Sequence, residues 1–219
     1  MPKRALTEKR PWLLASLVAA IGYYALIMTG QPVGEIWLML VKGAGVALLA
    51  VYALQRHSSF AARLLALVLI LSALGDMLIE LSLIWGGAAF FASHLAAIAL
   101  YLRNQRHIST ISQKVLGAAL LLITPIMCWL LTRDPAVTAY GVALGAMAAS
   151  AWMSRFSRYR VGLGAVLFVV SDWLIFYGIG HPDGSMIPSL LIWPLYYCGQ
   201  FLIATGVIQT LRQELPDAA

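Results

Sequence analysis

Apolar and polar positions divide this chain into long blocks. Stretches of about 20 mainly apolar residues alternate with short segments rich in charged or turn-forming residues. A helix needs about 20 apolar residues to cross a bilayer core, so the pattern predicts eight membrane-spanning helices. Their expected ranges are 11–29, 33–54, 61–80, 86–102, 115–132, 136–153, 161–180 and 187–211.

Details of the pattern favour one compact bundle. The third and fourth helices are expected to meet in a tight turn between Glu80 and Gly87. Pro125 and Pro194 fall inside helices, where a membrane protein tolerates kinks. Runs of Gly and Ala such as 141–146 suit close helix packing. We therefore predict an all-α protein with a single integral membrane domain over residues 1–219, in which 1–10 and 212–219 are cytoplasmic tails.

Composition supports a membrane protein. Of the 219 residues, 61% are hydrophobic and 11% are charged, whereas a soluble domain carries about 25% charged residues. The first apolar stretch lacks a clear small-residue cleavage site, so we expect a retained helix rather than a signal peptide. Cys128 and Cys198 both lie in apolar stretches and are expected to be buried structural thiols.

The basic residues are distributed asymmetrically. All but two of the 15 Lys and Arg residues lie in the tails or in the loops after the second, fourth and sixth helices. The exceptions are Arg133, on the opposite side, and Lys42, inside a helix. Positive loops face the cytoplasm, so we expect both termini there, in the inner membrane of a bacterium. The net charge of +6 then indicates membrane lipids as partners and no nucleic acid.

Several polar side chains fall at membrane depth, where a charged group costs about 2.5–3.5 kcal/mol. They come from five helices and are, in chain order, Lys42, Asp76, His94, Asp172, Tyr196, Tyr197 and Gln200. Glu80 follows Asp76 by four residues, on the same face of a helix and nearer the surface. With helices running alternately outward and inward, most of these groups fall at a similar depth in the outer half of the bilayer. This convergence predicts one polar cavity.

Each of these residues also has a structural explanation. Lys42 could neutralise a buried aspartate, and His94 could be a packing histidine. Glu80 and the two tyrosines could anchor helices at the interface, and Gln200 could link helices. The two aspartates are the hardest to explain in this way.

An internal similarity connects the two aspartates. Residues 73–79, ALGDMLI, align with residues 169–175, VVSDWLI, and share a small residue, the aspartate and a Leu-Ile pair. Both segments belong to helices expected to run outward. The similarity fits two parallel four-helix halves that each contribute one aspartate.

These motifs resemble the YhhN/TMEM86 family, the lysoplasmalogenases, over most of the chain. Residues 164–172, GAVLFVVSD, resemble the family's GAxLFxxSD element, and residues 196–204, YYCGQFLIA, resemble its YYxGQxLI element. Leu74-Gly75-Asp76 and the Phe90 to His94 segment resemble two further family elements. The chain departs from the family at Gly43, where proline is frequent, and at Ala97, where tyrosine is common.

The resemblance implies an eight-helix membrane hydrolase without a cofactor. Such enzymes cleave the vinyl-ether bond of lysoplasmalogens, which are lysophospholipids, to a fatty aldehyde and a glycerophospho-base. The family's catalytic pair corresponds to Asp76 and Asp172. The residues expected to bind substrate or support the pair are Lys42, His94, Tyr196, Tyr197, Gln200, Ser171 and Glu80.

The chemistry of a vinyl ether suits two carboxyl groups. Protonation of the outer alkene carbon produces an oxocarbenium-like centre, water adds to it, and the hemiacetal collapses to aldehyde and alcohol. One carboxyl can act as the acid while the other supports the cation or activates water, as in glycosidases. The sequence does not assign which aspartate takes which part; Lys42 is expected to hold the ionised one.

Three other functions are compatible with the same residues. Asp76, Asp172 and His94 could together bind a catalytic zinc ion, which usually has three protein ligands. Buried carboxylates also serve as proton relays, so a small proton-coupled transporter is the main alternative. A non-catalytic scaffold or receptor is the third. Head-group preference, chain length and oligomeric state are left open.

Overall fold

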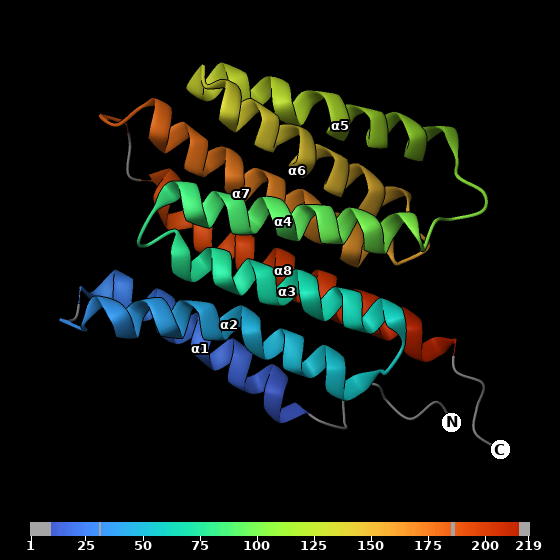
Figure 1. Cartoon of the computed structure of the whole chain (residues 1–219), viewed down its shortest axis with the longest axis horizontal. Helices are drawn as coiled ribbons and strands as arrows, with labels where there is room; N and C mark the ends of the chain where they lie inside the picture. The colour runs from blue at the N-terminus through green and yellow to red at the C-terminus, as the bar shows by residue number, and fades with distance from the viewer. Residues whose placement is uncertain (1–9, 31, 185–186, 215–219) are drawn as a thin grey trace. The chain divides into compact units, whose positions relative to one another are not determined.

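The computed structural model describes residues 10–30, 32–184 and 187–214 (Figure 1), and every regular element in them is helical. The eight α-helices are α1 (Arg10–Thr29), α2 (Glu35–Arg56), α3 (Phe60–Leu78), α4 (Leu83–Leu102), α5 (Ile111–Thr132), α6 (Pro135–Met153), α7 (Leu163–Gly180) and α8 (Ile187–Gln213). A π-helical turn, η1 (Arg158–Gly162), precedes α7. Each α-helix is long and apolar enough to cross a membrane, so the predicted multi-pass all-α fold is confirmed. The described residues do not include the tail residues 1–9, among them Lys3, Arg4 and Lys9, or 215–219.

Capping residues explain where several helices begin. The Ser59 side chain accepts a hydrogen bond from the Ala62 N–H at the start of α3. Thr110 and Gln113 form a reciprocal capping box that starts α5 at Ile111, four residues before the predicted boundary. Asp134 caps α6, whose first residue is Pro135. Each cap satisfies backbone N–H groups that have no partner within the helix.

The connection between α3 and α4 differs from the expected one. The N–H groups of Leu81 and Ser82 both donate to the carbonyl of Leu78, which closes a turn and ends α3 before Glu80. Glu80 therefore lies in the turn and not on the helix face of Asp76. Gly86 is inside α4, where an added Cβ would lie 2.6 Å from the Ile79 Cα. This glycine is needed for close approach of the two segments, not for a turn.

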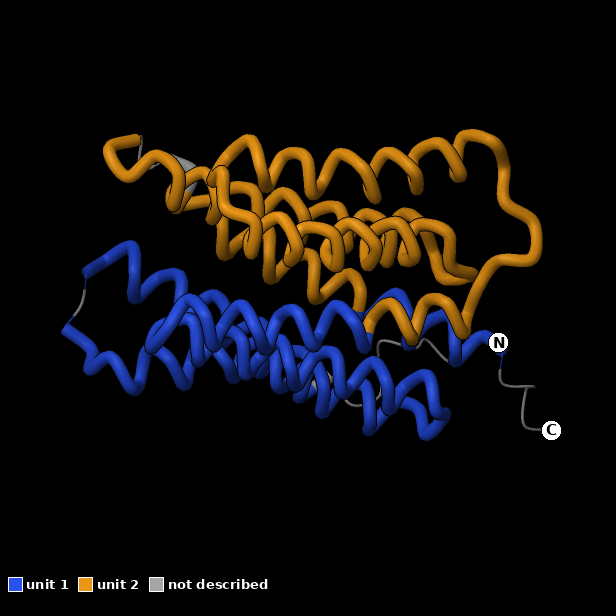
Figure 2. Tube along the Cα trace, turned by 45° about the horizontal axis from the view of Figure 1, so that its top comes forward, with its two compact units in different colours: residues 1–96, 204–219 blue, residues 97–203 orange. Residues whose placement is uncertain are grey.

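The contacts divide the chain into two compact units, coloured separately in Figure 2. Unit 1 comprises residues 1–96 and 204–219. In its described part, α1 packs on α2 and α2 packs on α3. The Ser16 hydroxyl of α1 donates to the Gly45 carbonyl of α2. A Cβ on Gly43 would lie 2.6 Å from Met77 Cγ, so α2 and α3 approach closely beside Lys42.

Unit 2 comprises residues 97–203, in which α5 packs on α6 and both contact α7. Glycines of α6 explain the close α5–α6 packing, as the Gly/Ala run predicted. A Cβ on Gly141 would lie 2.6 Å from Cys128 Sγ, and a Cβ on Gly145 would lie 2.8 Å from the Leu120 carbonyl oxygen. Small residues at such crossings let backbones come together in a membrane.

The two cysteines differ in environment. Cys128 is fully buried, as expected, but Cys198 is exposed. The expectation for Cys198 was wrong because apolar composition does not reveal which side of a membrane helix faces the protein. Its neighbour Tyr197 lies on the buried side of α8, about 100° away around a helix with 3.6 residues per turn.

Candidate active site

In unit 1, the lysine inside α2 forms an ion pair. Lys42 Nζ contacts Glu80 Oε1, from the turn after α3. The Lys42 side chain is 13% exposed and that of Glu80 is 45% exposed. The ammonium group also lies over the ring of Tyr23 in α1, 5.6 Å from its centroid. The structure therefore brings Lys42 and Glu80 together and adds Tyr23, which the sequence analysis did not single out.

Asp76 belongs to the same region of unit 1. It lies in the last turn of α3 and is almost fully buried. Its charge acts on both Lys42 and Tyr23. The residue before it, Gly75, lies against Phe90 of α4, because an added Cβ would be 2.8 Å from the Phe90 ring. Asp76 thus lies within electrostatic range of the Lys42 ammonium, and the residue before it packs closely against the following helix.

His94 is also buried in unit 1 but lies deeper along its helix than expected. Because α4 begins at Leu83, His94 falls past the middle of that helix. Next to it, Ser93 donates a hydrogen bond to the Val68 carbonyl, 3.0 Å away, and Ser72 lies 2.8 Å from the Ser93 hydroxyl. These bonds fix α4 on α3 at the level of His94.

In unit 2, Asp172 is buried in the middle of α7 and accepts a hydrogen bond. The donor is the Tyr140 hydroxyl of α6, 2.7 Å from Asp172 Oδ2. The Tyr140 ring packs edge-on against Phe176, one turn further along α7. The charge of Asp172 also acts on the Cys128 thiol of α5. The Asp172 carboxyl group is thus bonded to α6 and lies within electrostatic range of α5.

Contacts between α7 and α8 position the two motifs of unit 2, residues 164–172 and 196–204, against each other. The Ser171 hydroxyl donates to the Ile192 carbonyl, 3.0 Å away. A Cβ on Gly164 would lie 2.6 Å from the Gly199 carbonyl oxygen, and a Cβ on Gly199 would lie 2.7 Å from that of Gly164. Backbone therefore meets backbone at this crossing. Ser171, next to Asp172 in the chain, thus links α7 to α8.

The tyrosines of α8 are buried, as their predicted depth implied. Tyr196 packs edge-on against Phe168 of α7, with ring centroids 5.1 Å apart. Tyr197 stacks on Trp193, 5.9 Å away. Both rings have aromatic neighbours within the protein, which is unlike an anchor at the membrane surface.

Gln200 has an unusual environment for a buried amide. It is 1% exposed, and neither its Oε1 nor its Nε2 has a hydrogen-bond partner among the described residues. A buried amide without a partner costs about 1–3 kcal/mol, and such groups are rare in native proteins. Interhelical linkage, the structural explanation for Gln200, finds no support in these contacts. An amide whose oxygen and N–H groups are both available is suited to binding water or a substrate oxygen.

The candidate residues are thus divided between the two units. Lys42, Glu80, Asp76 and His94 belong to unit 1, and Ser171, Asp172, Tyr196, Tyr197 and Gln200 belong to unit 2. Tyr140 is the residue of unit 2 that sequence reasoning missed. A tyrosine near a helix end is commonly an interfacial anchor, so only its contact with Asp172 reveals it. Within each unit, the described residues contain no group of three His, Cys, Asp or Glu side chains placed to hold a metal ion.

Comparisons with known proteins cover most of the chain. Residues 37–207 match the model of the YhhN family. Proteins named lysoplasmalogenase from Mycobacterium bovis and Mycobacterium tuberculosis are each 30% identical to this chain over 192 residues. The matched region covers 81% of this chain and 72% of each relative. No solved structure gives a significant match.

Proposed function

The chain belongs to the YhhN family, and from this premise we propose that it is a membrane hydrolase that cleaves the vinyl-ether bond of lysoplasmalogens. The products are a fatty aldehyde and a glycerophospho-base. The observation that carries the proposal is the burial of two aspartates inside membrane-spanning helices, each beside a polar side chain of the preceding helix. Buried acids are expensive in a membrane, and an acid-dependent hydrolysis gives both of them a purpose.

The surroundings of the two aspartates suggest how they divide the reaction. Asp76 lies in the same unit as the Lys42 ammonium, and a nearby positive charge favours a carboxylate, whereas Asp172 accepts a hydrogen bond from the neutral Tyr140 hydroxyl. We therefore assign Asp172 as the acid that protonates the outer alkene carbon. Asp76 supports the oxocarbenium-like centre or accepts a proton from the attacking water. This division follows the two-carboxyl logic of glycosidases.

The remaining residues take supporting parts. The Gln200 amide, which lacks a partner among the described residues, orients water or a substrate oxygen. Tyr140 orients the Asp172 carboxyl so that Oδ1 carries the proton. Tyr196 and Tyr197 form an aromatic wall with Phe168 and Trp193. The apolar chain of a lysolipid enters sideways from the bilayer, in which the whole protein is embedded. We place this bilayer as the inner membrane of a bacterium, with both termini in the cytoplasm.

Substitution of each aspartate tests the proposal directly. Asp76→Asn and Asp172→Asn should each lower aldehyde release from a lysoplasmalogen at least 100-fold, because general acid–base groups contribute about 10²–10⁴-fold. The matched control is Asp134→Asn at the exposed cap of α6. Asparagine caps a helix as well as aspartate does, so this variant should keep full activity. Folding is checked by size exclusion and thermal denaturation in detergent.

The outcomes separate this enzyme from a transporter. Normal aldehyde release from both aspartate variants would overturn the mechanism. No release from the folded parent protein, across lysolipids of different head groups and chain lengths, would overturn the proposed reaction itself. Proton-coupled uptake into vesicles by the parent protein, in the absence of aldehyde release, would favour the transporter.

A further inference from the structure

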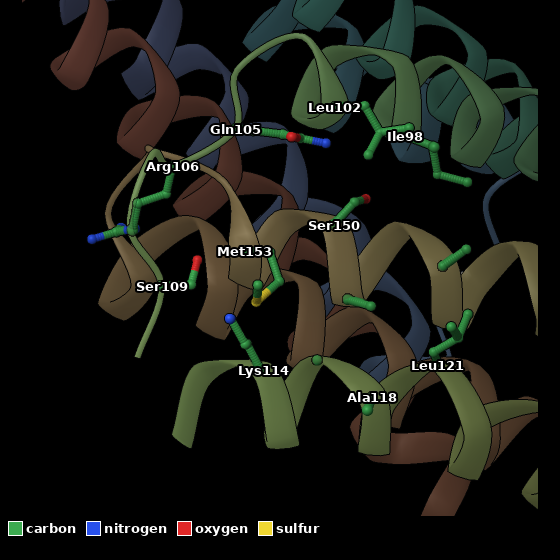
Figure 3. Close-up of a pocket in the computed structure, with 13 residues that line it drawn as sticks. Ile98, Leu102, Gln105, Arg106, Ser109, Lys114, Ala118, Leu121, Ser150 and Met153 are labelled. Carbon is green, nitrogen blue, oxygen red and sulfur yellow. The ribbon is translucent and has the colours of Figure 1, made fainter. Parts of the chain in front are cut away.

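Unit 2 also contains a pocket that is large enough to hold part of a lipid. A pocket of about 490 Å³ opens between the C-terminal end of α4, the first half of α5 and the second half of α6. Figure 3 shows Lys114 and Ala118 on one wall, Ile98 and Leu102 on another, and Ser150 and Met153 between them. Ligand pockets commonly measure about 300–1,000 Å³. None of the candidate active-site residues lines this one.

The pocket is apolar along most of its length and polar at one end. Its apolar wall includes Ile98, Leu102, Ala118, Leu121 and Met153, and its polar end consists of Gln105, Arg106, Ser109 and Lys114. Leu102 and Leu121 are 52% and 40% exposed, so the apolar part opens sideways. Both residues belong to membrane-spanning helices, and the opening therefore faces lipid.

The polar end is held in place by hydrogen bonds to the backbone. Arg106 Nη2 donates to the carbonyls of Ser154 and Phe156, at 3.2 Å each, and Arg106 Nε donates to the Ser154 carbonyl. The Arg106 N–H and the Arg155 N–H link the same two loops. These carbonyls orient the guanidinium without neutralising its charge. A cation is thus fixed in the wall of the pocket.

The charged side chains at this end of unit 2 are all basic. Besides Arg106 and Lys114, the loops there carry Arg103, Arg155, Arg158 and Arg160. The acids among the described residues of unit 2 lie elsewhere. Asp134 follows the C-terminal end of α5, Asp183 follows the C-terminal end of α7, and Asp172 is in the middle of α7. A ligand that fits must therefore combine an anion with an apolar chain.

We propose that this pocket is a binding site for an anionic phospholipid, with the phosphate at Lys114 and Arg106 and one acyl chain along α5 and α6. The second acyl chain passes through the lateral opening and lies in the bilayer. Basic pockets between membrane helices on the cytoplasmic side recognise such head groups, and this end of the unit is the one that the distribution of Lys and Arg assigns to the cytoplasm. The site is independent of the proposed hydrolysis.

Photolabelling of the full-length protein in phosphatidylcholine vesicles tests the site. The probes are a phosphatidylglycerol and a phosphatidylcholine, each with a diazirine near the end of one acyl chain, and labelled peptides are located by mass spectrometry. The anionic probe should label 111–121 and 146–153 at least fivefold more than the neutral probe. Equal labelling by the two probes would identify ordinary surrounding lipid and overturn the proposal.

Two variants with matched controls locate the head group and the chain. Lys114→Gln should lower labelling by the anionic probe about fivefold, because a basic residue at an anionic membrane surface contributes about 1 kcal/mol. Its control is Arg158→Gln, at the same end of the unit but outside the pocket. Ala118→Phe should block the chain and lower labelling at least fivefold. Its control is Val115→Phe, on an exposed position of α5 that does not line the pocket.

Unchanged labelling in both pocket variants, or an equal loss in their controls, would overturn the site. Because the readout is the position and amount of label, it does not depend on catalysis. A protein with no hydrolase activity would still give a decisive result.

Discussion

At the scale of single residues, the buried aspartates are defined by the side chains that face them. Asp172 receives a hydrogen bond from Tyr140, a residue without any motif to mark it. Lys42, expected to pair with an aspartate, forms its ion pair with Glu80 instead while its charge still acts on Asp76. These partners decide how each carboxyl group is held, so they are the first positions to test.

Tyr140→Phe removes the hydroxyl that donates to Asp172 and leaves the packing against Phe176 intact. We expect a drop in kcat of about two- to tenfold with little change in KM. One hydrogen bond contributes about 0.5–1.5 kcal/mol, and about 1.4 kcal/mol corresponds to tenfold in rate. Steady-state aldehyde release measures the change. Tyr159→Phe, at an exposed position of η1, is the control and should retain parent activity. A larger effect on KM than on kcat would show that Tyr140 contacts the substrate instead.

Lys42 and Glu80 should contribute unequally to stability although they form one ion pair. Glu80 is largely exposed, and such pairs contribute about 0–1 kcal/mol. Lys42→Met, in contrast, removes a cation that is only 13% exposed and whose charge also acts on Asp76, and the loss of one partner of a buried charge interaction costs about 3–5 kcal/mol. Thermal denaturation in detergent should therefore show a much larger loss for Lys42→Met than for Glu80→Gln. Equal losses of stability would mean that Lys42 stabilises the protein only through its ion pair with Glu80.

At the scale of helices, the two aspartate motifs have equivalent surroundings in their own units. In α3, Asp76 interacts with Lys42 of the preceding helix, and the small residue before it meets Phe90 of the following helix. In α7, Asp172 interacts with Tyr140 of the preceding helix, and Ser171 bonds to Ile192 of the following one. This correspondence gives physical content to the weak similarity between residues 73–79 and 169–175. The organisation of the chain as two parallel four-helix halves stays a prediction.

Glycine at the α7–α8 crossing should be irreplaceable, in contrast to glycine elsewhere in α7. Gly164→Ala places a Cβ 2.6 Å from the Gly199 carbonyl oxygen, and backbone cannot move aside as a side chain can. We expect a loss of about 1–3 kcal/mol, as for other overpacked sites, and a fall in activity. Gly178→Ala in the same helix has no neighbour within 4 Å of the added Cβ. It should be neutral or stabilising by up to about 1 kcal/mol.

Thermal unfolding of the two glycine variants measures this difference. Equal melting temperatures would show that the helices separate at the crossing without cost. The close approach would then have no part in positioning Asp172.

At the scale of the whole molecule, the proposed orientation rests on charge. The eight helices of the described residues would place both termini on the same side of the membrane, and we expect the basic loops to place that side in the cytoplasm. A green fluorescent protein fused after Ala219 should therefore fluoresce in a bacterial host. Alkaline phosphatase inserted after Arg133, in the turn between α5 and α6, should be active. The opposite pair of results would reverse the topology.

Most of the fold could be predicted from the sequence. The eight helices are found with boundaries within a few residues of the expected ones, because helix length in a bilayer is set by its thickness. The errors occur where local bonding decides the boundary. The capping box at Thr110 makes α5 begin at Ile111, earlier than predicted. Gly86 allows a close approach to Ile79, and α4 begins at Leu83, before its glycines. The prediction that Cys198 is buried was wrong because composition does not show which helix face is turned inward.

The sequence by itself determined that this is a multi-pass membrane protein of the YhhN family, and it identified the two aspartates as residues that a bilayer would not tolerate without a purpose. Hydrophobic length and the cost of a buried charge are properties of segments and single residues, so a linear pattern expresses them. Only the tertiary structure decided that Tyr140 faces Asp172, that Lys42 pairs with Glu80, that Gln200 is buried without a partner among the described residues, and that a basic pocket lies beside α5. These facts depend on the rotation and closeness of neighbouring helices, which are set by packing between residues 20 to 50 positions apart in the chain.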